Sequence, residues 1–382
     1  MTSASPRPRA VVSSTVAITA ASFYTEFINE LGVRGYEIHV VTSPGAGFES
    51  LRGTADHVHA LHMHRGVSPA RDLVALVRWV RLLRRLRPQV VLGGTPKAGL
   101  LSMLAGRLTG VPRRTYLLQG LRLEGATGRQ RWLLSRMERM ASRCSQRVIA
   151  VSPSLASEFT RLRLNAGRPV VLPHHGSSHG VDTVHFSPRS GDPNLLAELG
   201  FEPQVPVAAF IGRLTADKGP EMLIRALTEL ADHGTRLQLL VIGAQDEPDS
   251  RQYVAALHGL GTSVPVRVLN QIDDVRPYLA LSDILVLPTK REGMPNVVLE
   301  AAAMGLPVVT TTATGAVDSV IHGVTGLLVD PDDGRAMAQA LHSLSVDPAL
   351  RHRLGQAARE RVVRDYQPLD VARSIIDHAT RR

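Results

Sequence analysis

The sequence predicts an α/β protein of two facing Rossmann-like domains, each with a parallel sheet, and a cleft between them. Its 382 residues are too many for one ordinary domain and suit two. Short apolar runs typical of buried strands alternate with helical patterns from end to end. The segment 174–188 is rich in Gly, Ser, His and Pro without a periodic pattern, so it is the predicted linker. We expect an N-terminal domain over residues 1–187 and a C-terminal domain over 188–365, with a last helix in 366–382 able to pack back on the first domain.

Each predicted strand is a short apolar run, and each predicted helix carries apolar residues at helical spacing. In the first half we expect strands at 9–16, 37–42, 58–63, 89–92, 115–118, 147–151 and 170–172, with helices between them such as 68–86 and 128–144. In the second half we expect strands at 207–211, 237–242, 266–269, 283–287, 307–311 and 326–329, and helices at 219–230, 295–304, 334–344, 348–363 and 369–378.

Positive charge is concentrated in the first half. Residues 1–187 hold 25 Arg and Lys against 10 Asp and Glu, a net charge of +15. Residues 188–382 hold 19 basic and 24 acidic residues, a net charge of −5, so the two halves sum to +10. This asymmetry predicts that the first half faces an anionic partner. Nucleic acid is not expected, because aromatic residues are only 4% of the chain and no helix-turn-helix, zinc-finger or RNA-binding motif occurs.

Two predicted helices carry much of this charge. A basic amphipathic helix either rests on anionic lipid or packs its apolar side on the sheet, and the sequence favours neither. No apolar run approaches the roughly 18 residues that a membrane span needs, and one cysteine allows no intramolecular disulfide. We expect a cytoplasmic protein, with a peripheral contact to the inner face of the cell membrane as one possibility. The residues concerned are Arg71, Arg78, Arg81 and Arg85, then Arg129, Arg136, Arg139 and Arg143, and the cysteine Cys144.

Four histidines, His57, His59, His62 and His64, lie within eight residues and raise the question of a metal site. On a strand, alternation would put the first two on one face and the last two on the other. The sequence shows no nearby cysteine or paired carboxylate to complete a ligand set. We therefore expect strand or loop histidines and no metal.

One motif suits a diphosphate. It runs from Phe210 to Gly219, where a buried strand is expected to end at Gly212 and a helix to begin. Glycine lets the backbone approach a ligand, and Arg213 and Lys218 follow it directly. Two cations and a helix N-terminus at the carboxyl end of a strand can bind a diphosphate.

A second motif, from Leu287 to Val309, adds two carboxylates. Glu292 is expected on a loop and Glu300 on the helix that follows it. Pro295 is expected in the first turn of that helix, which leaves free N–H groups to meet an anion. Because carboxylates accept hydrogen bonds from vicinal hydroxyls, these two residues could hold two sugar rings joined by a diphosphate.

Found together in this order, the two motifs resemble those of the family 4 glycosyltransferases, which have the GT-B fold, and the resemblance covers nearly the whole chain. It implies that Arg213 and Lys218 bind the donor diphosphate, that Glu292 binds the transferred sugar, and that these three form the catalytic group. It further implies that Glu300 binds the ribose, that the stretch after Leu269 reads the base, and that the reaction needs neither metal nor cofactor. The other implied donor contacts are Gly212, Asn270, Gln271, Gly293, Met294, Pro295, Asn296 and Val297.

The first half resembles the bacterial branch that extends polyprenyl-diphosphate-linked glycans, in strings such as Thr95-Pro-Lys-Ala-Gly-Leu-Leu101. This implies an acceptor side that includes Thr15, Lys97, Gln119 and Gly120. Two positions depart from that branch. Gln119-Gly120 stands where His-Gly is usual, and Gly93-Gly94 stands where His-x-His is usual, which puts the usual contacts near the sugar and acceptor in doubt.

The resemblance implies a retaining transferase that moves a hexose or N-acetylhexosamine from a nucleotide sugar, preferably UDP-linked, to a lipid-diphosphate-linked glycan. Its partners would be that donor, a lipid-linked or small-molecule acceptor and an anionic membrane surface. Transfer to a soluble natural-product acceptor is the nearest alternative. A nucleotide-sugar epimerase would need carboxylates facing the sugar from the first half, where none stands in a motif. A non-catalytic binder of sugar nucleotides also stays open.

Overall fold

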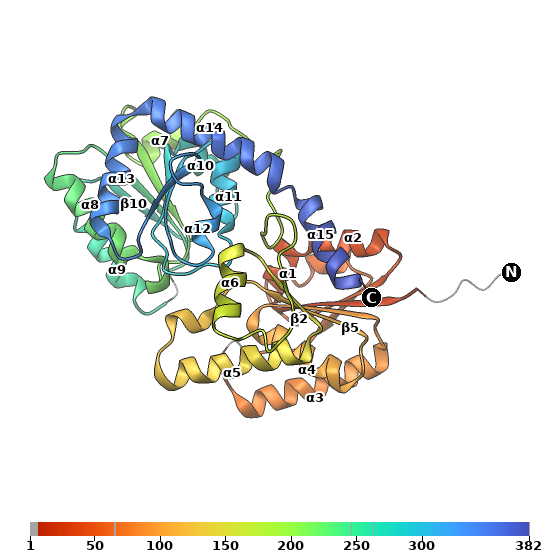
Figure 1. Ribbon diagram of the computed structural model, residues 1–382. Coiled ribbons are helices and arrows are strands. Elements are labelled where there is room, and N and C mark those ends of the chain that lie inside the picture. Colours follow the sequence, from red (N-terminus) through yellow and green to blue (C-terminus); the bar gives the residue numbers. More distant parts are fainter. Residues whose placement is uncertain (1–6, 65, 246, 262, 382) are drawn as a thin grey trace. The chain divides into compact units, whose positions relative to one another are not determined.

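The computed structural model describes residues 7–381 except 65, 246 and 262. The chain divides into two compact units, whose elements can be followed by their labels in Figure 1. One unit runs up to Gly180 and takes in the C-terminal segment from Pro368, and the other is Val181–Gln367. The division falls seven residues before the end of the predicted first domain.

The first unit contains a seven-stranded parallel sheet in the order β3-β2-β1-β4-β5-β6-β7. Its central strands are buried along almost their whole length, because helices cover both faces of a parallel sheet. The strands are β1 (Arg9–Val16), β2 (Glu37–Ser43), β3 (His57–Ala60), β4 (Val90–Gly94), β5 (Arg113–Leu118), β6 (Arg147–Ala150) and β7 (Val170–Val171).

Helices connect most of these strands. The last helix of the chain, α15, belongs to this unit and packs on α2, with Ile375 and Ile376 fully buried. An ion pair of 2.7 Å between Arg34 and Asp377 joins the same two helices. The helices are α1 (Ala17–Phe23), α2 (Thr25–Val33), α3 (Pro69–Leu86), α4 (Pro96–Leu108), α5 (Gly128–Cys144), α6 (Pro153–Arg161) and α15 (Pro368–Thr380), with 3-10 turns at Ser50–Gly53 and Arg122–Gly125.

The second unit contains a six-stranded parallel sheet in the order β10-β9-β8-β11-β12-β13. Its strands are β8 (Val207–Ile211), β9 (Gln238–Ile242), β10 (Val266–Leu269), β11 (Ile284–Leu287), β12 (Val308–Thr311) and β13 (Gly326–Val329). Its helices are α7 (Pro193–Glu198), α8 (Pro220–Asp232), α9 (Ser250–His258), α10 (Arg276–Leu281), α11 (Asn296–Ala303), α12 (Ala316–Ser319), α13 (Gly334–Val346) and α14 (Pro348–Asp365), with a 3-10 turn at Ala216–Lys218.

Apolar side chains from the sheet and its helices form the core of the second unit. Phe210 on β8, Leu227 on α8 and Leu341 on α13 are fully buried in one cluster. On the opposite face of the sheet, Leu285 and Val298 belong to a second cluster. Helices on both faces of a parallel sheet confirm the prediction of two Rossmann-like units. Among the described residues, no helix is both long enough and apolar enough to cross a bilayer.

The observed strands differ from the predicted ones mainly at their ends. The largest difference is at β3, which ends at Ala60 and not at residue 63 as predicted. His62 and His64 therefore lie in the connection to α3, and the predicted alternation of all four histidines on one strand is wrong. The apolar Leu61 and Met63 extended the sequence pattern, and both are buried, but they lie in the connection that follows β3.

Candidate active site

The first motif lies where β8 ends. The amide of Gly212 donates a hydrogen bond of 2.9 Å to the carbonyl of Ile242 in the neighbouring strand. A Cβ at Gly212 would meet no atom within 4 Å, so the backbone here faces open space. Arg213 is half-exposed, and its guanidinium lies 3.6 Å from the Glu247 carboxylate. The loop therefore presents bare backbone and a solvent-facing cation at the carboxyl edge of the sheet.

Gly219 brings this loop against the loop that follows β11. Its φ of 72° lies in the left-handed region, and a Cβ there would lie 1.9 Å from the carbonyl oxygen of Pro288. Only glycine lets the two backbones come this close. Two hydrogen bonds then join the loops, because the carbonyl of Asp217 accepts from Thr289 Oγ1 at 3.0 Å and from the amide of Lys290 at 2.8 Å. The two sequence motifs thus meet in one place.

Two ion pairs connect the same loops. Lys218 Nζ donates to Glu292 Oε1, and these side chains are only 18% and 13% exposed. Charges attract each other more strongly where water is partly excluded. The second pair joins Arg291 to Asp217 at 2.8 Å. Burial alone would raise the pKa of Asp217, but the hydrogen bond from Thr215 and the charge of Arg291 lower it below its usual value.

The turn after Glu292 leads into α11. Pro295 is the N-cap and Asn296 the first helical residue, one position later than predicted. Gly315, with a φ of 76°, supports this turn, because a Cβ there would lie 2.3 Å from the carbonyl oxygen of Gly293. Met294 is buried beside it. The helix begins at the edge of the sheet that carries the two ion pairs, and its first amides are suited to an anion.

Glu300 lies one turn into α11. Its side chain is partly buried, and burial raises the pKa of its carboxyl group to about 7. Within the part of the chain that the structure describes, no group donates a hydrogen bond to this carboxylate. A desolvated carboxylate without a donor is unfavourable. Glu300 is therefore able to accept hydrogen bonds from the hydroxyls of a ligand.

Asn270 and Gln271 follow the end of β10 and are both exposed. Strand β10 is two strands away from β8 in the sheet, which corresponds to about 10 Å. In a parallel sheet all carboxyl ends lie at one edge. The structure therefore brings these two residues to the same edge as Arg213, Lys218 and the α11 turn.

A second polar group lies at the carboxyl edge of the first unit's sheet. Thr15, near the end of β1, shares a hydrogen bond of 2.7 Å with Thr95 Oγ1 and accepts one of 3.2 Å from the amide of Ala98. The amide of Thr95 donates in turn to Gln119 Oε1, also at 3.2 Å. Thr95 has a φ of 60°, which is rare for a residue with a side chain. Such strain is often found at functional sites.

Lys97 does not reach open solvent. It is 5% exposed, and its amine lies 2.5 Å from the carboxylate of Asp72 on α3. Gly120 follows Gln119 directly at the end of β5, so it remains at the same edge as Thr15. Gln119 and Gly120 are therefore partly exposed at this edge, whereas Thr15 and Lys97 are both buried, and Lys97 is held in an ion pair.

Tyr24 explains the glycine at position 94. A Cβ at Gly94 would lie 1.9 Å from the Tyr24 hydroxyl and 3.4 Å from Gln119 Oε1. Tyr24 is fully buried, and burial raises the pKa of its phenol. The tyrosine thus fills the space that a larger side chain would need. The sequence did not predict this contact, because nothing in it indicates that the residue between α1 and α2 packs against β4.

Two models of known families match the chain. The model described as "Glycosyl transferases group 1" matches residues 205–347, and the "Glycosyl transferase 4-like domain" matches residues 20–175. The capsular polysaccharide biosynthesis glycosyltransferase CapM of Staphylococcus aureus is 32% identical over 337 residues, which are 88% of this chain and 87% of CapM. The chain belongs to the family 4 glycosyltransferases.

Two further proteins are also similar over most of their length. The lipopolysaccharide core biosynthesis glycosyltransferase LpsE of Rhizobium meliloti is 27% identical over 344 residues, or 90% of each chain. The structure of Anabaena HepE in complex with UDP and glucose has a TM-score of 0.77 at 19% identity, covering 97% of this chain and 99% of HepE. This likeness supports the GT-B fold, and the chain is a glycosyltransferase.

Away from the two motifs of this glycosyltransferase, histidines of β2 and β3 lie beside a carboxylate. Within residues 7–381, leaving out 65, 246 and 262, one trio of potential ligands has its atoms within 4.8 Å of one another: Glu37, His39 and His57. The sequence indicated no nearby cysteine or paired carboxylate to complete a ligand set, but the structure places Glu37 beside His57. Glu37 is twenty residues earlier in the sequence, and only the pairing of β2 with β3 brings the two together.

The contact between the two motif loops predicts the effect of one substitution. In Gly219→Ala the new Cβ would clash with the Pro288 carbonyl oxygen and require a left-handed backbone. We expect the free energy of unfolding to fall by more than the roughly 1–2 kcal/mol of a left-handed residue alone, and transferase activity to be lost. Gly234→Ala is the matched control, because Gly234 has a φ of 69° but open space around its Cβ. Equal losses of stability in urea unfolding would contradict the close contact.

Proposed function

We propose that this glycosyltransferase moves a hexose or N-acetylhexosamine from a UDP-sugar to a lipid-diphosphate-linked glycan. The observation that carries the donor assignment is the joining of Lys218 to Glu292, with Arg213 and Glu300 at the same edge of one sheet. A UDP-sugar is further supported by HepE, whose structure holds UDP and glucose. CapM and LpsE support a glycan acceptor, since their names assign them to capsular polysaccharide and lipopolysaccharide core synthesis.

In this proposal each side chain at the carboxyl edge of the sheet binds one part of the donor. Arg213 is free to move onto the diphosphate because it is half-exposed. Lys218 leaves Glu292 for the diphosphate, and Glu292 then accepts hydrogen bonds from the transferred sugar. Glu300, whose carboxylate has no donor among the described residues, accepts from the ribose hydroxyls. The base of the nucleotide would lie toward Asn270 and Gln271.

We further propose that transfer retains the configuration of the sugar and needs no metal. The bond between the sugar and the diphosphate breaks as the acceptor oxygen bonds to the same carbon on the same face. The acceptor's proton passes to the departing diphosphate oxygen, so no protein base is required. Arg213 and Lys218 stabilise the negative charge that develops on the leaving group, the task that a metal ion performs in other transferases.

The acceptor is assigned to the first unit, which carries most of the positive charge. A pocket of about 520 Å³ lies next to the end of β2, with Ser43, Met63 and Val74 in its wall. Arg71 and Arg78 on α3 also line it. Such a pocket suits a lipid that carries a diphosphate. The lipid chain would pack on the apolar wall, and the phosphates would bind the guanidinium groups.

The outer sides of α3 and α5 fit a membrane surface. Leu73, Val74 and Val77 on α3 are 62%, 52% and 40% exposed, and Trp132 on α5 is 62% exposed. Arginines flank these apolar side chains, and the guanidinium of Arg136 lies 5.4 Å from the Trp132 ring. Exposed apolar residues between cations are typical of surfaces that rest on anionic lipid. We infer a peripheral position on the cytoplasmic face of the membrane.

The diphosphate assignment predicts the behaviour of Arg213→Ala and Lys218→Ala. Each variant removes a charge-assisted hydrogen bond of about 1.5–3 kcal/mol, so the affinity for a UDP-sugar should fall about tenfold or more in each. Arg236→Ala is the control, because Arg236 is an exposed arginine that precedes β9, at the other edge of the sheet. Isothermal titration with the UDP-sugar measures the three affinities. Affinities of Arg213→Ala and Lys218→Ala within twofold of the parent would overturn the assignment.

The division of work between the carboxylates predicts opposite effects on UDP and on transfer. Glu300→Ala should weaken the binding of free UDP, because it removes the ribose contact. Glu292→Ala should leave UDP binding nearly intact while the rate of transfer falls, because UDP carries no sugar for it to bind. Titration with UDP and an assay of sugar transfer separate the two. The reverse pattern would refute the division.

The membrane surface predicts a dependence on lipid charge. The full chain should sediment with vesicles that contain anionic lipid, and added salt should release it, because exposed charges are screened over about 8 Å at physiological ionic strength. Replacement of Arg78, Arg81 and Arg85 by Gln should reduce vesicle binding and leave the affinity for UDP-sugar unchanged.

The matched control replaces three exposed arginines of the second unit, Arg225, Arg335 and Arg353, and should leave vesicle binding unchanged. Binding that ignores lipid charge, or an equal loss in both triple variants, would contradict the proposed surface. Activity confined to soluble acceptors would then favour transfer to a small natural product.

A further inference from the structure

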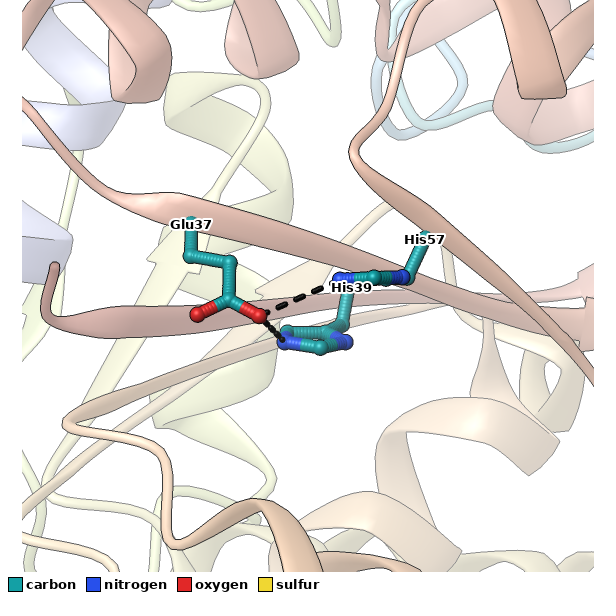
Figure 2. A group of neighbouring side chains, drawn as sticks. All are labelled: Glu37, His39 and His57. Atoms are coloured by element: carbon teal, nitrogen blue, oxygen red, sulfur yellow. Dashed lines mark hydrogen bonds and ion pairs between the residues drawn. The ribbon is translucent and has the colours of Figure 1, made fainter. Parts of the chain in front are cut away.

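Three potential metal ligands lie side by side on β2 and β3, as Figure 2 shows. His39 on β2 is opposite His57 on β3 in the strand register. Glu37 is two residues before His39, so the strand's period of two puts both side chains on one face. The three residues therefore converge from two neighbouring strands, near the point where each strand begins.

The distances between their atoms fit a tetrahedral metal ion. Glu37 Oε1 is 3.3 Å from His39 Nε2 and 3.1 Å from His57 Nε2. When zinc binds nitrogen and oxygen at roughly 2.0–2.1 Å, tetrahedral geometry separates neighbouring ligand atoms by about 3.3 Å. These two spacings are thus close to what one zinc ion requires, and all three ligand atoms lie within 4.8 Å of one another.

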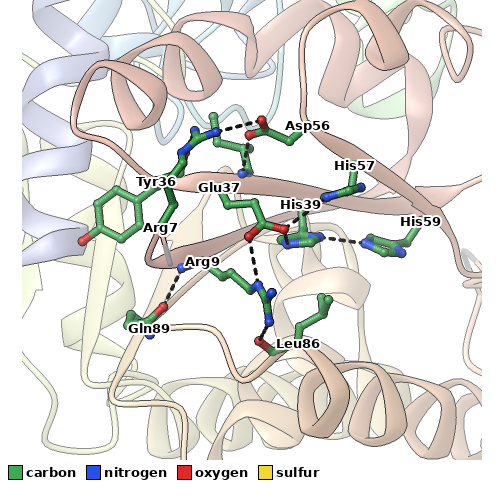
Figure 3. Close-up of polar contacts among 11 residues, drawn as sticks. Arg7, Arg9, Tyr36, Glu37, His39, Asp56, His57, His59, Leu86 and Gln89 are labelled. Carbon is green, nitrogen blue, oxygen red and sulfur yellow. Dashed lines mark hydrogen bonds and ion pairs between the residues drawn. The ribbon is translucent and has the colours of Figure 1, made fainter. Parts of the chain in front are cut away.

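Surrounding residues orient these ligands, as can be followed in Figure 3. His59 Nε2 lies 3.0 Å from His39 Nδ1, which leaves Nε2 of His39 toward the other ligands. Arg9 Nε donates to Glu37 Oε2 at 3.0 Å and leaves Oε1 for a metal. Such partners are typical of metal sites, where they fix the ring orientation and the carboxylate.

His39 supplies the observation that favours a bound ion over a network of side chains alone. It is 2% exposed, and among the described residues its Nε2 atom is buried and makes no hydrogen bond, although Glu37 Oε1 lies 3.3 Å away.

We propose that Glu37, His39 and His57 bind one Zn²⁺ ion that fastens β3, the edge strand of its sheet, to β2. Imidazole ligands favour zinc over magnesium or calcium. Water completes the coordination, because His57 is half-exposed. The site lies where β2 and β3 begin, whereas Thr15 and Thr95 lie at the carboxyl ends of the strands. The ion is therefore structural, and its binding does not depend on the proposed transfer function.

The test is a calorimetric titration of the chelator-treated full chain with Zn²⁺ and, separately, with Mg²⁺. We expect one zinc ion per chain and no binding of Mg²⁺. His57→Ala and Glu37→Gln should weaken zinc binding by at least about tenfold. His62→Ala is the matched control, since His62 is an exposed histidine five residues from His57, and should bind zinc like the parent.

A second readout separates the site from adventitious binding to the other histidines. Zinc at about 100 times its Kd should raise the unfolding temperature by roughly 5 °C in the parent and in His62→Ala, but not in His57→Ala. Because His57 is half-exposed, its replacement should leave the circular dichroism spectrum of the zinc-free chain unchanged. No zinc binding, or equal zinc binding in all variants, would overturn the proposal.

Discussion

The ion pair between Lys218 and Glu292 is the interaction on which the candidate donor site depends. It joins the loop after β8 to the loop after β11, which are distant in sequence, and it is largely shielded from water. The pair can form only because Gly219 lets the backbone of its loop pass against the Pro288 carbonyl oxygen. A single position without a side chain thus determines whether the two halves of the site meet.

This contact also explains how a buried ion pair can serve binding. Two partly desolvated charges are costly to separate unless another partner replaces the one that is lost. A diphosphate offers that replacement to Lys218, and the hydroxyls of a sugar offer it to Glu292. The resting pair therefore keeps both side chains in place until a ligand with both chemistries arrives. Glu300 has a different arrangement, since burial alone raises its pKa to about 7 and leaves it available for a ligand.

Most of the fold could be predicted from the sequence, because buried parallel strands are continuous apolar runs. Strands β1, β8, β10 and β13 have the predicted bounds, and the two motifs fall at strand ends as expected. What the sequence could not predict depends on which strands pair and in what register. The approach of Glu37 to His57, the space that Tyr24 takes beside Gly94, and the ion pair between Lys97 and Asp72 each join residues about twenty or more positions apart. Local patterns carry no information on such contacts.

In the proposed mode of binding, the carboxyl edge of the second unit holds the donor by exchanging the Lys218–Glu292 pair for contacts to the ligand. A crystal structure of the full chain with a non-hydrolysable UDP-sugar would show whether this exchange takes place. We expect the Lys218 amine and the Arg213 guanidinium to lie against the diphosphate oxygens, Glu292 against the sugar and Glu300 against the ribose. A diphosphate bound elsewhere, with Lys218 still paired to Glu292, would contradict it.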